Sequence, residues 1–140
     1  MREIKFRGKI HNGEWVYGSL VYFSNSVFVI HYEIGTATIR RFDWCYVDPD
    51  TVGQFTGLKD CNGKEIYEGD IIRSYDSKGD EIIHIIEHYD EEACFIARLN
   101  GYSKDDFGCG PVRQSWINEF KKEAIGNIHD NPELIKQCNE

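Results

Sequence analysis

Two histidines, His84 and His88, have the spacing in this sequence that most suggests chemistry. Residues four apart share one face of an α-helix, so a helical pair of this kind can bind one zinc ion. The segment around them, IIHIIEH, is rich in β-branched residues and therefore predicts a strand. Four residues of a strand span roughly 13 Å, whereas a zinc-bound nitrogen lies about 2.1 Å from the ion. We interpret both side chains as polar positions on a partly exposed strand, and no metal site is predicted.

The cysteines are the other reactive side chains; their number is odd, and no two form a CxxC pair. Cys61, beside Asn62 and Gly63 in a predicted turn, is expected to carry an exposed thiol. Cys109 lies between two glycines. A nucleophilic thiol needs a neighbouring base and a lowered pKa, and neither residue has a protease-like motif around it. No catalytic residue is predicted, and the protein is expected not to be an enzyme. The cysteines are Cys45, Cys61, Cys94, Cys109 and Cys138.

Residues 100–110, NGYSKDDFGCG, are predicted to form a loop because Gly, Asp and Ser predominate there. The pair Asp105-Asp106 could hold a cation or a basic partner, although such pairs are more often solvated. An enzyme with its site at this loop is one hypothesis. The glycine-rich run at 57–69 lacks the Lys-Ser/Thr of a phosphate-binding loop and the spacing of a dinucleotide site. No cofactor is predicted.

The elements that must position these residues are mostly strands. In the first third of the chain, aromatic and β-branched residues alternate with polar ones, as is typical of half-buried strands. Phe42, Trp44 and Tyr46, for example, share one face. Residues 1–50 are therefore predicted to form an antiparallel meander. Its strands are expected at 3–10, 14–23, 27–34 and 36–47.

Beyond Pro49, which ends the meander, the pattern changes. Residues 51–66 are predicted to form a central hairpin around an Asn-Gly turn. Residues 67–140 are predicted to form a barrel-like, SH3-like part. Its strands are expected at 71–73, 80–89, 93–99 and 124–128. The length of 140 residues favours a single domain, 1–140.

Two short helices complete the prediction. Ser115 is placed as the N-cap of the first, with Trp116, Ile117 and Phe120 at helical spacing. Asn131 and Pro132 are a favourable start for a terminal helix over 133–138. The predicted fold class is mainly β, with bent antiparallel sheets and short helices.

Charge limits the partners. The chain carries 16 Lys and Arg against 24 Asp and Glu, a formal net charge of −8, and such a field repels phosphate. Nucleic acid is therefore a disfavoured partner, although a local basic patch is conceivable. No apolar run approaches the ~20 residues of a membrane helix, and the start MREIKFRGK is charged. We expect a cytoplasmic protein with reduced thiols and no membrane contact. The candidate patch residues are Arg2, Lys5, Arg7, Lys9, Arg40 and Arg41.

Aromatic residues are unusually dense in the first third. A small sheet has two faces and cannot cover both by itself, and interfaces favour aromatic side chains. We expect the second face to pack on the C-terminal part or on another subunit, and a homo-oligomer is the favoured state. The aromatic residues concerned are Trp15, Tyr17, Phe28, Tyr32, Trp44 and Tyr46.

Two longer stretches carry a family likeness. They are residues 47–72, VDPDTVGQFTGLKDCNGKEIYEGDII, and residues 124–135, AIGNIHDNPELI. With the start REIKFRG and the later WVYGSL, the sequence resembles the YopX family of phage- and prophage-encoded proteins. The resemblance implies a complex, mostly β fold of bent sheets with short helices, and a higher homo-oligomer. It implies no reaction.

Together these features predict a phage or prophage accessory protein of unknown biochemical activity, which acts through self-assembly and binding rather than catalysis. Its expected partners are itself and a phage or host protein. The alternative hypothesis is a nucleic-acid-binding module on an SH3-like barrel.

Overall fold

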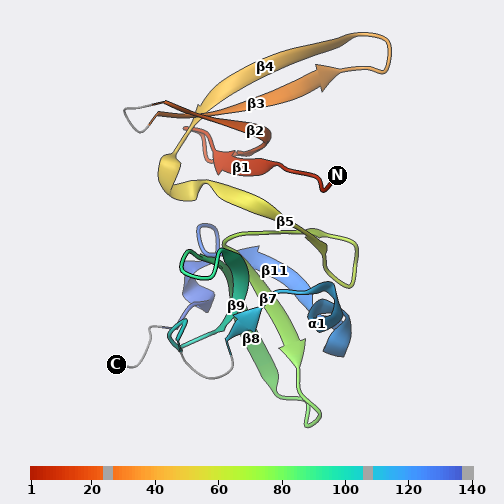
Figure 1. Cartoon of the computed structure of the whole chain (residues 1–140), viewed down its shortest axis with the longest axis vertical. Helices are drawn as coiled ribbons and strands as arrows, with labels where there is room; N and C mark the ends of the chain where they lie inside the picture. The colour runs from red at the N-terminus through yellow and green to blue at the C-terminus, as the bar shows by residue number, and fades with distance from the viewer. Residues whose placement is uncertain (24–26, 106–108, 137–140) are drawn as a thin grey trace. The chain divides into compact units, whose positions relative to one another are not determined.

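A computed structural model describes residues 1–23, 27–105 and 109–136 (Figure 1). The chain is mainly β, as predicted, and its strands pair antiparallel. It divides into two compact units, which we call unit 1 (Met1–Phe55) and unit 2 (Thr56–Glu140). Strand β5 (Gly53–Lys59) begins in unit 1 and ends in unit 2. The single domain over 1–140 stays a prediction.

In unit 1 each of the first four strands pairs antiparallel with the next one along the chain. Its strands lie in the order β4-β3-β2-β1-β5, and the hydrophobic alternation seen in the sequence matches the observed register. The first four strands are β1 (Phe6–Lys9), β2 (Trp15–Phe23), β3 (Val27–Gly35) and β4 (Arg40–Val47).

Strand β2 changes partners at Gly18. Up to Gly18, which lies opposite Phe6, it pairs with β1, and from Ser19, opposite His31, it pairs with β3. A Cβ atom on Gly18 would lie only 2.2 Å from the main-chain oxygen of His31. Only glycine permits this close approach of two backbones, so Gly18 fixes the point at which the sheet turns from one strand pair to the next.

Unit 2 holds a five-stranded sheet in the order β10-β9-β8-β7-β11. In the described residues, β10 and β11 are its two edges and no pairing closes a ring, so the SH3-like barrel is not confirmed. Strand β6 pairs instead with β5. The strands are β6 (Glu65–Tyr67), β7 (Asp70–Tyr75), β8 (Glu81–Tyr89), β9 (Cys94–Leu99), β10 (Gly110–Pro111) and β11 (Glu123–Asn127).

The core of unit 2 is built from isoleucine. A cluster of buried apolar side chains joins strands β6 to β9 and the helix α1 (Gln114–Asn118), and Trp116 and Leu58 pack against it. Burial of apolar surface of this kind is the dominant favourable contribution to folding. The members of the cluster are Ile66, Ile72, Ile86, Ala97 and Ile117, and the four isoleucines have no exposed surface.

Three hairpins share one turn design. In each, the first residue donates a main-chain hydrogen bond to the fifth and accepts one from a glycine with φ of +81° to +85°. Three-residue loops of this kind need a left-handed residue, which glycine adopts without strain. The Asn-Gly turn predicted for residues 51–66 is one of these three-residue loops, at Asp60–Lys64. The other two span Ile10–Glu14 and Asp76–Asp80.

The helices are shorter than predicted. Ser115 lies inside α1, which begins at Gln114 with Arg113 at the N-cap position and no side-chain cap, so the Ser115 prediction is wrong. Main-chain pairing continues to Val112, whose N–H donates to Phe95, and the helix starts directly after it. The other helical segments are single 3-10 turns at Pro49–Thr51, Glu119–Lys121 and Pro132–Leu134.

The predicted terminal helix over 133–138 is likewise only the turn Pro132–Leu134, as far as it is described. Asn131 does not cap it, because its side-chain oxygen accepts a hydrogen bond from the Asn127 N–H at 3.2 Å. Residues 137–140 lie outside the described residues, and with them Cys138.

Candidate functional site: an aromatic face on unit 1

The predicted strand around the two histidines is confirmed as β8. His84 packs edge-on against Trp116 with ring centroids 5.0 Å apart, and His88 lies 2.6 Å from Asp90. Burial, with a smaller contribution from the charge of Lys122, lowers the pKa of His84 to about 4. The two rings therefore have separate surroundings in unit 2. Across residues 1–23, 27–105 and 109–136, no cluster of three or more metal-ligating side chains is found.

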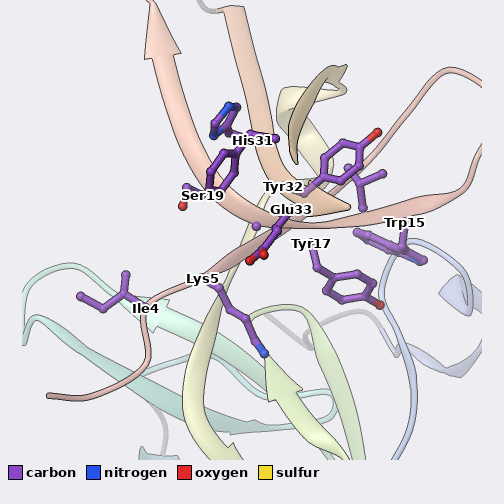
Figure 2. A pocket seen from close by; sticks show the side chains of 11 residues that line it. Ile4, Lys5, Trp15, Tyr17, Ser19, His31, Tyr32 and Glu33 are labelled. Carbon is purple, nitrogen blue, oxygen red and sulfur yellow. The ribbon is translucent and has the colours of Figure 1, made fainter. Parts of the chain in front are cut away.

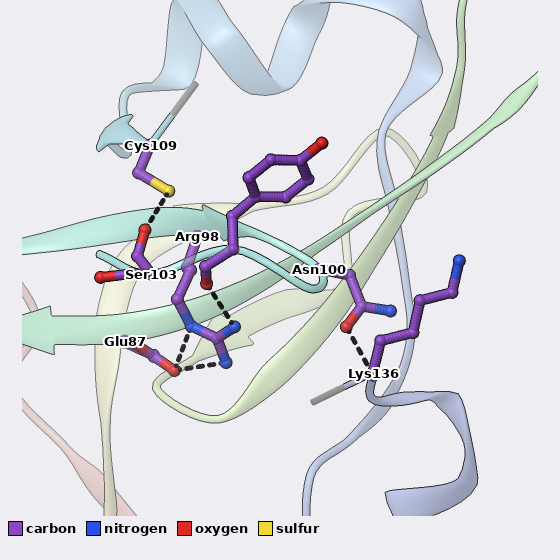
Figure 3. A network of polar contacts seen from close by, with 7 residues as sticks. Glu87, Arg98, Asn100, Ser103, Cys109 and Lys136 are labelled. Carbon is purple, nitrogen blue, oxygen red and sulfur yellow. Dashed lines mark hydrogen bonds and ion pairs between the residues drawn. The ribbon is translucent and has the colours of Figure 1, made fainter. Parts of the chain in front are cut away.

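The described residues of the predicted loop 100–110 make polar contacts within unit 2 (Figure 3). The Arg98 guanidinium bonds Glu87 at 2.8 Å and also donates to the main-chain oxygen of Tyr102 at 3.0 Å. The Cys109 thiol donates to the main-chain oxygen of Ser103 at 3.2 Å, so its neighbour is a carbonyl group and not a base.

Of the predicted acidic pair, Asp105 is described and Asp106 lies outside the described residues. Asp105 accepts a 2.8 Å hydrogen bond from the Tyr89 hydroxyl, and this bond is the main reason that the pKa of Tyr89 rises to about 12. Cys61 is exposed, as expected. These groups do not converge on one point in unit 2.

Most of the basic residues of unit 1 contact an acidic side chain or an aromatic ring. Lys5 lies 2.9 Å from Glu3, and Arg40 lies 3.3 Å from Glu33. The Arg7 guanidinium stacks 4.6 Å from the centre of the Trp15 ring, and Lys9 lies 5.3 Å from the same ring; Arg7 is itself buried. Arg2 and Arg41 are exposed. Because most of these cations already contact an anion or an aromatic ring, they do not form a bare phosphate-binding patch.

A hollow of about 440 Å³ lies where β2 bends at Gly18 (Figure 2). Its walls are mostly aromatic, with Lys5, Ser19 and Glu33 as the polar groups. The His31 and Phe42 rings stack with centroids 5.3 Å apart and an angle of 13° between their planes. The hollow can therefore receive a flat apolar group beside a carboxylate. The aromatic walls come from Trp15, Tyr17, His31, Tyr32 and Phe42.

The hollow continues into a wider feature, which we call the aromatic face. Alternate residues of β2 and β4 point to the same side of the meander because the register of β2, β3 and β4 is regular. On the opposite side Ile30 is fully buried and Val47 is 6% exposed, while Tyr22 is 61% exposed. The aromatic face consists of Tyr17, Val21, Phe23, Phe42, Trp44 and Tyr46, whose exposed fractions run from 40% to 68%.

The sequence pattern already placed Phe42, Trp44 and Tyr46 on one face, and that is confirmed. The exposure of that face was not predictable, because it depends on which element lies over the sheet. Of the other aromatic residues singled out in the sequence, Trp15, Phe28 and Tyr32 are half-buried. The bend at Gly18 was also missed, although an isolated glycine inside a strand pattern is a recognised signal of close backbone approach.

A second polar cluster lies in unit 2 around Lys122, which is buried. Its ammonium group donates to the main-chain oxygen of Glu119 at 2.8 Å and lies 4.5 Å from the centre of the Trp116 ring. Burial lowers the pKa of Lys122. Phe120 has a left-handed backbone, with φ of +56°. These contacts of Lys122 hold the turn before β11 against Trp116.

The comparisons with known proteins agree with this architecture. The chain belongs to the YopX family, because the family model described as YopX protein matches residues 5–136. The crystal structure of protein EF1440 from Enterococcus faecalis is similar, with a TM-score of 0.59 and 22% sequence identity over 97% of this chain and 100% of that chain. At that identity the likeness shows a shared fold. No curated protein matches the sequence. Among the described residues, no helix is long and apolar enough to cross a membrane.

Proposed function

We propose that this YopX-family protein is a phage or prophage accessory protein that assembles into a homo-oligomer and acts by binding rather than by catalysis. The observation that carries the proposal is the aromatic face of unit 1. Aromatic side chains present roughly 150–250 Å² each, and about half of each is exposed on this face. The face thus offers on the order of 500 Å² of apolar surface, which is in the upper part of the range for the largest patch on a monomeric protein, and such patches are often functional.

Unit 1 also has little core of its own. Among its described residues, the buried hydrophobic side chains are those of Val29, Ile30, Val47 and Phe55. A unit of about 55 residues buries only about 60% of the surface that its unfolded chain exposes, and is therefore marginal by itself. Covering the aromatic face with another chain supplies the missing burial, so assembly is the state in which unit 1 gains most.

The absence of catalysis belongs to the same proposal and rests on chemistry. Burial and the neighbouring Asp43 raise the pKa of the Cys45 thiol, which disfavours the reactive thiolate. The Cys109 thiol donates to a carbonyl oxygen. A nucleophile is activated by the opposite arrangement, with a base beside it or a lowered pKa.

The test of assembly is the molar mass of the full chain in solution, measured by sedimentation at micromolar concentration. We expect a multiple of the chain mass for the unchanged protein. Tyr46→Ser, which truncates a side chain of the aromatic face, should weaken self-association at least ten-fold. The matched control is Tyr102→Ser, an exposed tyrosine of unit 2, and it should leave the mass unchanged. A monomer at every concentration for the unchanged protein contradicts the proposal.

Nucleic-acid binding by a module on an SH3-like barrel is the alternative. It has weaker support, because the β7–β11 sheet is open in the described residues and the candidate basic residues lie in unit 1. The exposed Arg2 and Arg41 favour it, while the net charge of −8 and the contacts already made by Lys5, Arg7 and Arg40 oppose it. Phosphate contacts strengthen at low salt. Retardation of DNA or RNA in a gel at low ionic strength, lost as salt rises, would establish this alternative in place of the first proposal.

A further inference from the structure

The edge strand of unit 1 is open in a way that the edges of unit 2 are not. Strand β4 ends the strand order of its sheet and is eight residues long, with an unbroken register against β3 and no proline. In unit 2, β10 is two residues long and β11 carries a register shift between Ala124 and Gly126. Short or bulged edges discourage pairing with other chains, whereas a long regular edge is a template for it.

The backbone groups that β4 presents outward can be assigned. Hydrogen bonding alternates along an antiparallel ladder, and Thr36 N–H donates to Ile39 O in the register that continues into β4. The residues whose main-chain N–H and C=O groups face away from β3 are thus every second one from Arg40, which includes Phe42 and Trp44. In agreement, Trp44 N–H is bonded at 2.8 Å to the side chain of Asp43 and not to β3.

The sequence of β4 is self-complementary in one register. If two copies of β4 run antiparallel with Phe42 opposite Phe42, Arg41 of each copy lies opposite Asp43 of the other, giving two pairs of opposite charge. If the two-fold axis moves by one residue along β4, Asp43 lies opposite Asp43 or Arg41 lies opposite Arg41. Such like-charge pairs are destabilising. Arg41 and Asp43 are both exposed. In the pairing, the second strand replaces the hydrogen bond that Asp43 accepts from Trp44 N–H.

We propose that β4 pairs antiparallel with β4 of a second copy of this chain about a two-fold axis at Phe42, held in register by Arg41 and Asp43. The inference rests on the proposed function, homo-oligomeric assembly, and names one contact of that assembly, the β4 edge, and its partner. An isologous contact of this type uses the same patch twice and closes on itself.

The pairing also extends the aromatic face. Directly opposite residues of an antiparallel pair point to the same side of the sheet, so Phe42 meets its own copy and Arg40 meets Trp44 of the second copy. A guanidinium over an indole ring is a favourable contact. Arg41 and Asp43 oppose pairing with an arbitrary strand and complement each other in this one, so they give specificity.

Charge variants of the full chain test the register. Arg41→Glu or Asp43→Arg alone turns both opposite-charge pairs into like-charge pairs, and we expect the dissociation constant to rise about ten-fold or more. The double variant Arg41→Asp with Asp43→Arg keeps the pairs opposite and should restore self-association to within about three-fold. The difference between single and double variants should shrink in 0.5 M salt, because exposed charges are then screened.

A cysteine at the axis tests the geometry. Opposed residues of a hydrogen-bonded antiparallel pair have Cα atoms about 5.5 Å apart, inside the range of about 4.4–6.8 Å for a disulfide. Phe42→Cys, made with Cys61→Ser to remove the exposed thiol, should form a covalent dimer under mild oxidation. The control is Ser19→Cys in the same background. Ser19 is exposed and points to the same side of the sheet as Phe42. It lies roughly 24 Å from its copy, across five strand spacings, so it should form no disulfide.

The outcomes separate the two proposals. A monomeric unchanged protein refutes assembly, and this inference with it. An oligomer that responds equally to the single and double charge variants, or that cross-links no better through Cys at position 42 than at position 19, refutes the β4 pairing and leaves assembly standing. Circular dichroism of every variant establishes that it is folded, and restoration by the double variant shows that the loss in the single variants is not misfolding.

Discussion

The two units differ in where their apolar side chains and their charges lie. Among the described residues, ten of the large hydrophobic residues that are exposed belong to unit 1 and four to unit 2, although unit 2 is the longer. Nine buried hydrophobic residues belong to unit 2 and four to unit 1. Residues 1–55 carry six Lys and Arg and six Asp and Glu, so the net charge of −8 resides entirely in residues 56–140.

This difference indicates that the two units contribute differently to stability and to the proposed assembly. Unit 2 has its own isoleucine core and carries the net negative charge, which opposes close approach of its copies. Unit 1 has no net charge and presents apolar surface. The proposed assembly therefore assigns self-association to unit 1 and most of the stability to unit 2, and each of the following changes tests one of these two assignments.

The largest effect is expected in the core of unit 2. Ile86 is fully buried, so Ile86→Ala removes apolar contacts and leaves a cavity, and we expect the free energy of unfolding to fall by about 4 kcal/mol. Ile39→Ala in unit 1 is the matched control, because Ile39 is 72% exposed, and it should cost less than about 0.5 kcal/mol in dilute protein. Urea denaturation measures the free energy of unfolding of both variants. If both variants lost the same amount, the contrast between the core of unit 2 and the exposed surface of unit 1 would be wrong.

The next effect belongs to unit 1. Gly18→Ala would place a Cβ atom 2.2 Å from the backbone of β3, and we expect it to destabilise the protein by about 3 kcal/mol because the strands must separate. The control is Gly110→Ala in unit 2, where nothing lies within 4 Å of the added atom. Thermal unfolding compares them. A stable Gly18→Ala protein would mean that the bend of β2 is not fixed by this contact.

Sequence reasoning recovered what depends on local pattern. The alternation in residues 27–34 and 36–47 predicted β3 and β4 and the residues that share a face of each, although β4 begins only at Arg40. Asn62 and Gly63 gave a correct turn, because the left-handed conformation is a property of the residue itself.

What sequence reasoning missed depends on neighbours distant in the chain. Ser115 is a good cap by type, yet the pairing of Val112 with Phe95 sets where α1 starts. That β4 is an edge follows from the strand order, which no single segment contains. The aromatic candidates were correct in kind, but which of them are exposed is decided by how the sheet is covered, and the same holds for the hollow beside Gly18.

A smaller effect should follow from pH in unit 2. His84 has a pKa of about 4 in the folded protein, below the ordinary 6.5, because it is buried. Both states hold it neutral above pH 6.5; as the pH falls from 6.5 towards 4, only the unfolded chain takes up the proton, so stability is lost in that window. We expect the unchanged protein to lose about 2 kcal/mol more than His84→Gln between pH 7.5 and pH 5. The control, His88→Gln, should keep the full loss, and an identical pH profile for His84→Gln contradicts the assignment.

The smallest effect compares one ion pair from each unit. Arg98 and Glu87 of unit 2 are mostly buried, with 12% and 26% of their side chains exposed and a separation of 2.8 Å, whereas Arg40 and Glu33 of unit 1 are 68% and 46% exposed and 3.3 Å apart. We expect Arg98→Gln to cost about 1.5 kcal/mol, since it leaves a shielded carboxylate without its partner. Arg40→Gln should cost less than about 0.5 kcal/mol because water already screens the exposed pair. Urea denaturation at low and high salt measures both, and only the Arg40→Gln effect should vanish in high salt. If Arg40→Gln proved the costlier change in dilute protein, unit 1 would draw its stability from surface charge, and the assignment of stability to unit 2 would fail.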